Sequence, residues 1–358
     1  MRPVFIMMIL FFIALAMSWI IYTPILRIAK QKNLVDSPGE RKLQSAPVPV
    51  MGGLAVFFGI VVALCFFKTT VNYVNLFSTI CAMMIMLYVG SIDDILDISA
   101  SLKFAVEVLV CLLIIYGTRN LMINFQGLLG IWKMPLAVAI PFTVFGMVGI
   151  INSINMIDGV DGLSSGMGIL AFLSFSLFLF CTHEYSYCAL SIICAGALVP
   201  FFIHNVFGTR TKMYIGDGGA LMMGTAMAAL IINILKGRGL AYEGGIPEFG
   251  RLSLVSMCLA VMSVPVFDTL RVMVIRVIHG QSPFHADRRH LHHWFLSFGY
   301  SPKQTSFTIL SINLFIISVW FFSYACGASV TLQFFIVLGC SLLLIIGLAR
   351  FLEIHKGK

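Results

Sequence analysis

The chain has 358 residues, a net charge of +8 and a hydrophobic content of 59%, while only 11% of its residues are charged. An ordinary soluble domain carries roughly 25% charged residues, so the composition excludes that class. A mean hydropathy of +0.99 indicates a protein that crosses a membrane several times. The nine cysteines lie within or beside apolar runs and form no C-x-x-C motif, so we expect them to pack as small side chains without disulfides.

The apolar runs have lengths suited to membrane helices, because a helix needs about 20 apolar residues to cross the hydrocarbon core. About eleven such runs follow one another, at residues 4–25, 50–67, 76–92, 102–116, 135–151, 163–181, 187–203, 220–235, 252–270, 307–324 and 332–348. The first is too long for a signal peptide core and no small-residue cleavage site follows it, so we expect a retained anchor. The predicted fold is all-α, with residues 1–358 forming a single transmembrane domain.

Basic residues divide unevenly between the two sides of eleven alternating spans. Sixteen of the 23 lysines and arginines fall on one side and seven on the other. The richer side is normally cytoplasmic, which places the amino terminus outside. All nine aspartates fall on that same side, although they were not used to assign it. We therefore expect a composite polar site, the active site, at the cytoplasmic ends of the helices.

Three aspartates end the third apolar run, in the sequence SIDDILDI at residues 91–98. If the stretch is helical, Asp97 lies one turn from both Asp93 and Asp94. Carboxylates this close repel one another unless a cation lies among them or one holds a proton. The alternative is a solvated loop in which Asp97 or Ser99 caps the next helix.

Polar residues recur at every third position in the sequence NSINMIDGVDGL at residues 152–163, and they are Asn152, Asn155, Asp158 and Asp161. Amide and carboxylate oxygens are ligands that magnesium prefers, and glycines such as Gly159 and Gly162 let a backbone approach a ligand closely. The alternative is an interhelical turn rich in turn-forming residues.

A glycine-rich helix entry follows at residues 214–219, in the sequence YIGDGG. Free backbone N–H groups at such an entry suit a phosphate, and Asp217 suits a metal bound to that phosphate. A simple helix N-cap formed by Asp217 is an equally good interpretation.

Histidines and arginines crowd the sequence SPFHADRRHLHH at residues 282–293. Together with Arg288 and Arg289, the side chains of His290, His292 and His293 are donors able to hold a diphosphate. The alternatives are a zinc site, which the absence of a nearby cysteine disfavours, and a plain surface loop. Two further acids receive a structural interpretation: Glu107 is expected to pair with Lys103, and Asp268 with Arg271.

Clustered carboxylates, magnesium-type ligands and phosphate-binding donors in a membrane protein suggest phosphoryl transfer on a lipid. The motifs DDILD (93–97), NSINMIDGVDGL (152–163), GDGG (216–219) and HLHH (290–293) resemble, in this order, those of the polyprenyl-phosphate N-acetylhexosamine-1-phosphate transferases. The DDxxD and HxHH patterns look like the undecaprenyl-phosphate N-acetylglucosamine-1-phosphate transferase branch, the WecA type. Two departures are Gln44 and Ala220, where relatives often have histidine and serine.

The resemblance implies that UDP-N-acetylglucosamine and undecaprenyl phosphate give undecaprenyl-diphospho-N-acetylglucosamine and UMP. Asp217 and Asn155 would hold magnesium, or alternatively manganese. Asp93 and Asp94 would lie where the lipid phosphate arrives, with Asp93 positioning or deprotonating it for a single in-line attack; a covalent aspartyl intermediate is the alternative. Substrate binding is assigned to Asn152, Asp158, Gly159, Asp161, Asn205 and Tyr214, with the uridine pocket among them, and to Arg289, His290, His292 and His293 at the diphosphate.

Several alternatives stay open from the sequence. The sugar could be another UDP-N-acetylhexosamine (fucosamine, quinovosamine or galactosamine) or UDP-N-acetylmuramyl-pentapeptide. A membrane transporter is the rival from another class, but its polar groups should lie near the bilayer midplane rather than at one face. The resemblance implies the bacterial inner membrane, contact with membrane lipids, a homodimer, no nucleic-acid partner, and the first membrane step of an O-antigen, enterobacterial common antigen or teichoic acid pathway.

Overall fold

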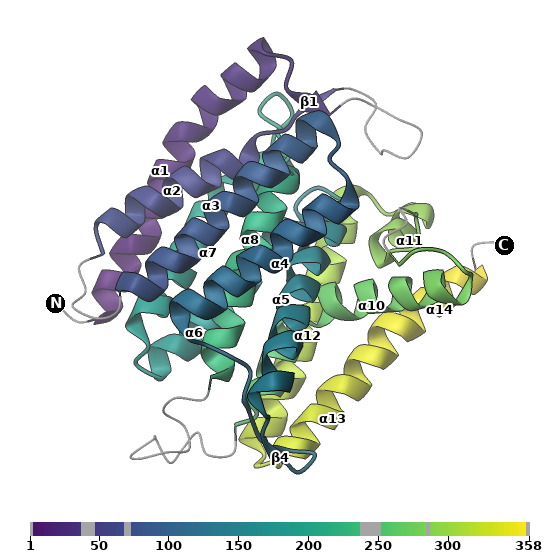
Figure 1. Ribbon diagram of the computed structural model, residues 1–358. Coiled ribbons are helices and arrows are strands. Elements are labelled where there is room, and N and C mark those ends of the chain that lie inside the picture. Colours follow the sequence, from purple (N-terminus) through teal and green to yellow (C-terminus); the bar gives the residue numbers. More distant parts are fainter. Residues whose placement is uncertain (1–2, 37–46, 68–72, 237–251, 284–286, 356–358) are drawn as a thin grey trace. The chain divides into compact units, whose positions relative to one another are not determined.

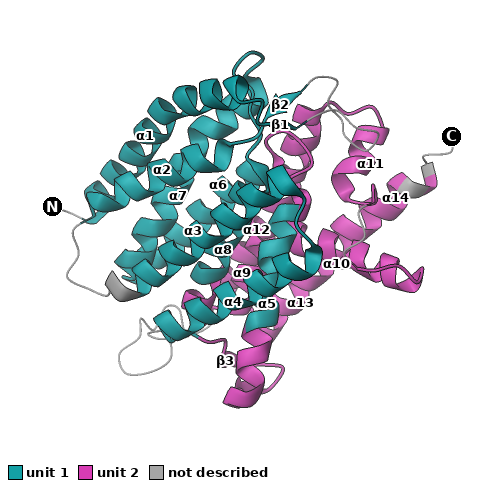
Figure 2. Cartoon of the chain, turned by 45° about the horizontal axis from the view of Figure 1, so that its top comes forward, with its two compact units in different colours: residues 1–120, 144–155, 164–230 teal, residues 121–143, 156–163, 231–358 magenta. Residues whose placement is uncertain are grey.

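The computed structural model describes residues 3–36, 47–67, 73–236, 252–283 and 287–355 (Figure 1). Gln44, whose effect on the first cytoplasmic loop the sequence left open, lies outside the described residues. The chain divides into two compact units: residues 1–120, 144–155 and 164–230 form the first, and residues 121–143, 156–163 and 231–358 form the second (Figure 2). The interpretation of the whole chain as one transmembrane domain stays a prediction.

The first unit is a bundle of long apolar helices in which α1 packs on α2 and α7, and α3 packs on α4 (Figure 1). Its elements, with two helices that extend beyond the unit, are α1 (Pro3–Gln31), β1 (Val35–Asp36), β2 (Val48–Pro49), α2 (Gly52–Cys65), α3 (Tyr73–Leu96), α4 (Ala100–Thr118), α5 (Leu136–Ile157), α6 (Leu163–Cys181), α7 (Tyr185–Phe207) and α8 (Gly216–Leu235). Strands β1 and β2 pair antiparallel.

Helix α8 is the most buried helix of the bundle, because its most apolar stretch is fully enclosed. Glycines let the backbone of its first turn pack directly against the backbones of α2 and α3. A Cβ on Gly90 of α3 would lie 2.5 Å from the Cα of Gly218, and a Cβ on Gly53 of α2 would lie 2.5 Å from the Cα of Gly219. The close approach fixes the start of α8 against the end of α3, where the acidic motif lies.

The second unit begins with a β-hairpin and continues with shorter helices. Its elements are β3 (Asn124–Leu128), β4 (Ile131–Lys133), α9 (Leu254–Val261), α10 (Ser263–Ile278), α11 (Leu291–Ser297), α12 (Pro302–Ala325), α13 (Val330–Ser341), the π-helix η2 (Leu342–Gly347) and α14 (Leu348–His355). The hairpin and α11 were not predicted from the sequence. The register of the β3–β4 pair is irregular between Asn124 and Leu128.

A sharp break separates α9 from α10, which meet at a bend of 77°. Pro265 has no N–H group, so the carbonyl of Val261 loses its helical partner. The fully buried side chain of Asn313 on α12 replaces that bond: its amide donates to Val261 O at 3.0 Å, and its Oδ1 accepts from Val264 N at 3.0 Å. The two backbone groups exposed by the break are therefore satisfied within the apolar interior.

The helices confirm a membrane protein with many spans but differ from the predicted count of about eleven. Among the described residues, nine helices are long and apolar enough to cross a membrane, and the bent pair α9–α10 brings the number to ten. The run at residues 50–67 forms only the 14-residue helix α2, which is shorter than the roughly 20 residues that a full crossing needs. Which face of the membrane each loop occupies stays a prediction.

Candidate active site

Lys103 joins two of the predicted site aspartates in the first unit. Its Nζ lies 2.7 Å from Asp93 Oδ2 at the end of α3 and 2.5 Å from Asp217 Oδ2 at the start of α8. The side chains of Lys103 and Asp93 are 16% and 14% exposed, so water screens their contact weakly, whereas that of Asp217 is 37% exposed. A single cation therefore lies between carboxylates that are 124 residues apart in the chain.

Asp94 is bonded to the backbone of α8. Its Oδ1 accepts from Asp217 N at 3.0 Å and its Oδ2 lies 3.5 Å from Gly218 N, so it caps the helix that carries Asp217. Gly216 allows this contact in two ways: its φ is +75°, and a Cβ there would lie 2.5 Å from Asp94 Oδ2. The carboxylate also meets the positive end of the α8 dipole.

Asp97 lies just beyond the end of α3 with φ of +48°, and its N–H donates to Asp93 O at 3.1 Å. Ser99 caps α4, because its hydroxyl accepts from Leu102 N at 3.4 Å. The capping alternative raised for this motif is thus correct for Ser99, while Asp93 and Asp94 make the contacts to Lys103 and α8.

Glu107 is fully buried one turn from Lys103, but its bonded partner is Asn152 of α5. Asn152 Nδ2 donates to Glu107 Oε2 at 2.5 Å and to Val148 O at 3.0 Å. Glu107 and Lys103 therefore do not form the expected ion pair: Glu107 bonds Asn152, while Lys103 bonds the two aspartates. The bond to Asn152 also places the last turn of α5 beside the first turns of α4.

Asn155 follows Asn152 by three residues in this last turn of α5. Its Oδ1 atom is buried and has no hydrogen-bond partner among the described residues. An unpaired buried amide oxygen is costly, so the site is suited to a ligand that would satisfy it. Helix α8 packs directly on α5, since a Cβ on Gly224 would lie 2.8 Å from the Cα of Ile151.

Backbone contacts hold the segment that leads into α8. Tyr214 N donates to Pro49 O at 2.8 Å and Tyr214 O accepts from Gly52 N at 2.9 Å. Asn205 Nδ2 donates to Met213 O at 3.0 Å. The structure thus gives Tyr214 and Asn205 a part in shaping the entry to the helix of Asp217.

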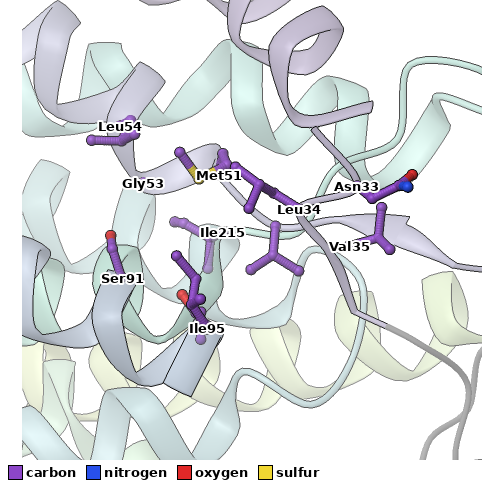
Figure 3. A pocket seen from close by; sticks show the side chains of 11 residues that line it. Asn33, Leu34, Val35, Met51, Gly53, Leu54, Ser91, Ile95 and Ile215 are labelled. Atoms are coloured by element: carbon purple, nitrogen blue, oxygen red, sulfur yellow. The ribbon is translucent and has the colours of Figure 1, made fainter. Parts of the chain in front are cut away.

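A cavity of about 160 Å³ lies in this unit beside Asp94 (Figure 3). Its walls come from the β1 region, the start of α2 and the end of α3, and polar and apolar atoms contribute to them about equally. The residues that line it are Asn33, Leu34, Val35, Val50, Met51, Gly53, Leu54, Ser91, Asp94, Ile95 and Ile215.

The histidine motif belongs to the second unit. The rings of His290 and His292 stack with centroids 5.7 Å apart, and those of His292 and His293 lie 4.2 Å apart. A Cβ on Gly159 would lie 2.6 Å from His292 Nε2, so the glycine makes room for this ring. The structure therefore joins two motifs that are 133 residues apart in the sequence.

The remaining predicted residues of this unit lie in turns and loops. Asp158 and Asp161 belong to the turn after α5, and Asp161 O accepts from Ser306 Oγ at 2.6 Å. Arg289 Nη1 is a buried donor without a hydrogen-bond partner among the described residues. A buried cationic donor of this kind suits an anion such as a phosphate.

Comparison with known proteins decides the class of this chain. A match to glycosyl transferase family 4 covers residues 76–235. The undecaprenyl-phosphate alpha-N-acetylglucosaminyl 1-phosphate transferase of Pasteurella multocida (strain Pm70) is 30% identical over 283 residues, which cover 77% of this chain and 75% of the relative. The protein of the same name from Escherichia coli (strain K12) is 25% identical over 295 residues, which cover 80% and 75%.

The chain belongs to glycosyl transferase family 4. This is the family of polyprenyl-phosphate N-acetylhexosamine-1-phosphate transferases, so the predicted resemblance and the predicted enzyme class are confirmed. The family 4 chain is a multi-pass membrane enzyme with bacterial relatives.

Enzymes of family 4 generally depend on magnesium, and the residues present fit that ion. Among the described residues, no group of three or more His, Cys, Asp or Glu side chains is arranged as a complete metal site. Magnesium needs few protein ligands, because it keeps several waters and binds substrate phosphates. The Asp217 carboxylate and the buried, unpaired Asn155 Oδ1 are oxygen atoms of the kind that this ion prefers.

Burial keeps two histidines of the motif at residues 290–293 uncharged. It lowers the pKa of His292 well below 6.5, and it lowers the pKa of His293 to about 4 with help from the neighbouring charge of Arg288 and from His290. Without substrate, both rings are therefore neutral near pH 7, and each offers one N–H donor. Asp287 has a lowered pKa despite its burial because Arg276 bonds it.

Sequence reasoning missed Lys103, which it had paired with Glu107 alone. The one available signal was its position: Lys103 is the basic residue in the first turn of the helix that follows the acidic motif. Its role depends on the start of α8 lying beside α4, which local sequence does not reveal.

Proposed function

We propose that this enzyme transfers N-acetylglucosamine 1-phosphate from UDP-N-acetylglucosamine to undecaprenyl phosphate, releasing UMP. The similarity to relatives that carry this activity in their names supports the choice of substrates. The observation that carries the proposal is the contact of Lys103 with Asp93 and Asp217, because it brings two motif carboxylates to one cation. A transfer between two phosphate groups requires positive charge beside the phosphates, and carboxylates can hold that charge in place.

In this proposal Asp217 and Asn155 hold magnesium, or alternatively manganese, against the diphosphate of the donor. The bound ion would neutralise charge on the diphosphate. Lys103 keeps Asp217 turned toward Asp93 and offers a second positive charge to the phosphates. Asp94 contributes by fixing the first turn of α8, so its contribution to catalysis is made through the position of Asp217.

The acceptor phosphate is proposed to arrive at Asp93, which positions or deprotonates it for an in-line attack on the β-phosphorus. A covalent intermediate on this aspartate is the alternative mechanism. The cavity beside Asp94 is assigned to the isoprene unit nearest the phosphate, because apolar side chains such as Leu34 and Ile95 form part of its wall next to this carboxylate. A lipid acceptor explains why the carboxylates lie at the ends of membrane-spanning helices.

The remaining proposed substrate-binding residues include the histidine motif of the second unit. Arg289 and the three motif histidines bind the diphosphate, and the buried unpaired Nη1 of Arg289 supports this assignment. The uridine is assigned to Asp158, Gly159, Asp161 and Tyr214, and Asn152 and Asn205 complete the set of proposed substrate-binding residues. Cytoplasmic placement of this face, the bacterial inner membrane and a homodimer are further parts of the proposal.

A purified protein in detergent tests the reaction. With UDP-N-acetylglucosamine, undecaprenyl phosphate and magnesium, we expect UMP and a lipid-linked sugar. Asp217→Ala should abolish product formation, whereas the matched variant Asp97→Ala should keep most of it, because Asp97 is exposed at the end of α3. Absence of UMP with every UDP-N-acetylhexosamine would reject the proposal. It would favour a transporter, whose activity cannot be seen in detergent because transport needs two compartments.

The same assay identifies the sugar, which the similarity of 25% to 30% does not fix. The panel consists of UDP-linked N-acetylglucosamine, N-acetylgalactosamine, N-acetylfucosamine, N-acetylquinovosamine and N-acetylmuramyl-pentapeptide. We expect the highest kcat/KM for N-acetylglucosamine. A higher value for another donor would change the sugar and the polysaccharide pathway while leaving the transfer chemistry intact.

A further inference from the structure

Asp268 of α10 is a buried carboxylate to which no part of the reaction has been assigned. It is 1% exposed. Four nitrogen atoms lie within hydrogen-bonding distance of its two oxygens: Arg271 Nε at 3.3 Å, Arg271 Nη2 at 2.7 Å, His290 Nδ1 at 3.0 Å and Leu291 N at 3.1 Å. The expected pair with Arg271 is confirmed, but it is only one half of this arrangement.

Together, Asp268 and Arg271 hold three consecutive residues of the histidine motif. Arg271 Nη2 also donates to Arg289 O at 2.5 Å. Asp268 accepts from the ring of His290 and from the backbone of Leu291, the first residue of α11. Hydrogen bonds therefore hold the backbone at Arg289 and Leu291, on either side of His290, and the ring of His290 itself.

The bond to the ring settles which nitrogen of His290 carries a proton. An ionised carboxylate can only accept, so Nδ1 must donate to Asp268, and Nε2 is the nitrogen left to meet a substrate. Carboxylates that bond the far side of a functional imidazole commonly set its tautomer and ring orientation. The stack of His290 on His292, with ring planes 3° apart, passes this orientation to the next histidine of the motif.

We propose that Asp268 is a positioning residue for the transfer reaction, which fixes the tautomer of His290 and so presents Nε2 to the diphosphate as UMP departs. Asp268 acts through His290 and does not touch the substrate. This inference rests on the proposed function, because it assigns His290 to the diphosphate.

A double-mutant cycle separates this role from a purely structural one. Asp268→Asn can donate its amide N–H to Nδ1 and so favour the wrong tautomer. We expect kcat to fall about 10-fold to 100-fold, with KM for the UDP-sugar changing much less. In a His290→Gln background the same substitution should cause little further loss, because its target is already gone. If the fold-loss in kcat of the double variant equals the product of the fold-losses of the two single variants, the proposal is overturned.

Asp287→Asn is the matched control for the cycle. Asp287 is also a carboxylate of this region, bonded by Arg276 and by Arg289 N, but it makes no bond to His290. Its effect on kcat should therefore multiply with that of His290→Gln. Equal non-additivity for both aspartates would contradict a specific role for Asp268. Each variant is first checked for a cooperative melting transition.

Nitrogen NMR of ¹⁵N-histidine-labelled wild-type enzyme gives a second test that requires neither a stable variant of Asp268 nor activity. The His290 signals are identified by their loss in His290→Gln. We expect Nδ1 to carry a proton at every pH at which the protein is folded. An unprotonated Nδ1 overturns the inference even if the enzyme is active. A protonated Nδ1 without any UMP formation in the assay would reject the proposed function alone.

Discussion

At the scale of single residues, the site depends on contacts among three charged side chains. Asp93, Asp217 and Lys103 carry two negative charges and one positive charge, within 2.7 Å contacts. If Asp217 holds magnesium as proposed, the ammonium of Lys103 would compete with the ion for this carboxylate. Substrate phosphates would draw the lysine away and leave the carboxylate to the metal, so Lys103 and magnesium are expected to act in sequence on the same oxygen.

Replacing Lys103 with methionine tests that competition. We expect turnover to fall at least about tenfold, because a positive charge near the phosphates is lost. The magnesium concentration that gives half-maximal activity should fall as well, since no ammonium competes for Asp217. Lys133→Met, at an exposed position of β4, is the control and should change neither quantity. A higher magnesium requirement in Lys103→Met would contradict the competition.

Gly159 tests the contact between the turn after α5 and the histidine motif. A methyl group at this position would meet His292 Nε2 at 2.6 Å, so Gly159→Ala must displace the ring. We expect KM for the UDP-sugar to rise several-fold while the protein still folds. Gly149→Ala is the control, because a Cβ there meets no atom within 4 Å. An unchanged KM in Gly159→Ala would remove this contact from substrate binding.

The buried His292 and the half-buried His293 predict a pH dependence of stability. The pKa of His293 is about 4 in the folded protein against 6.5 for a free side chain, and that of His292 is lowered as well. Between these values the unfolded chain binds protons that the folded chain does not, so stability falls as the pH falls. We expect Tm to decrease between about pH 7 and about pH 5, and His293→Gln to reduce the decrease. A Tm that rises on acidification would contradict the burial of neutral rings.

At the scale of elements, the sequence predicted where the helices lie better than how they bend. Each predicted run overlaps one or more helices, because length and hydropathy are enough to locate them. The break at Pro265 was missed, since residues 252–270 read as one apolar run and the partner Asn313 comes much later in the chain. The start of α8 shows the same limit: its motif was found, but the capping of α8 by Asp94 depends on two helices meeting.

Asn313→Leu tests the account of the break. Leucine has the same branching and the same number of heavy atoms as asparagine, but it cannot hydrogen-bond, so Val261 O and Val264 N–H are left buried without partners. Each lost partner costs about 1–3 kcal/mol, so we expect a clear decrease in Tm. Ser318→Ala on the exposed side of the same helix should leave Tm unchanged. A stable Asn313→Leu protein would show that other groups or water satisfy the break.

At the scale of the whole molecule, the chain combines an acidic cluster in its first unit with a histidine cluster in its second. The sequence predicted both, because carboxylates and histidines stand out in a chain with 11% charged residues. It did not predict Lys103, or the grip of Asp268 and Arg271 on the histidine motif, because these contacts join residues from different helices and loops. The family establishes the enzyme class, and the contacts within each unit suggest which residues act together.

The central claim is that the enzyme transfers a phosphosugar and not the sugar alone. The most direct measurement follows phosphorus from UDP-N-acetylglucosamine labelled with ³²P at the β-phosphate, incubated with purified enzyme and undecaprenyl phosphate. We expect the label to enter the lipid fraction at the same rate as unlabelled UMP is released. We expect Asp217→Ala to abolish both. Labelled UDP as the released product, with no label in the lipid, would contradict it.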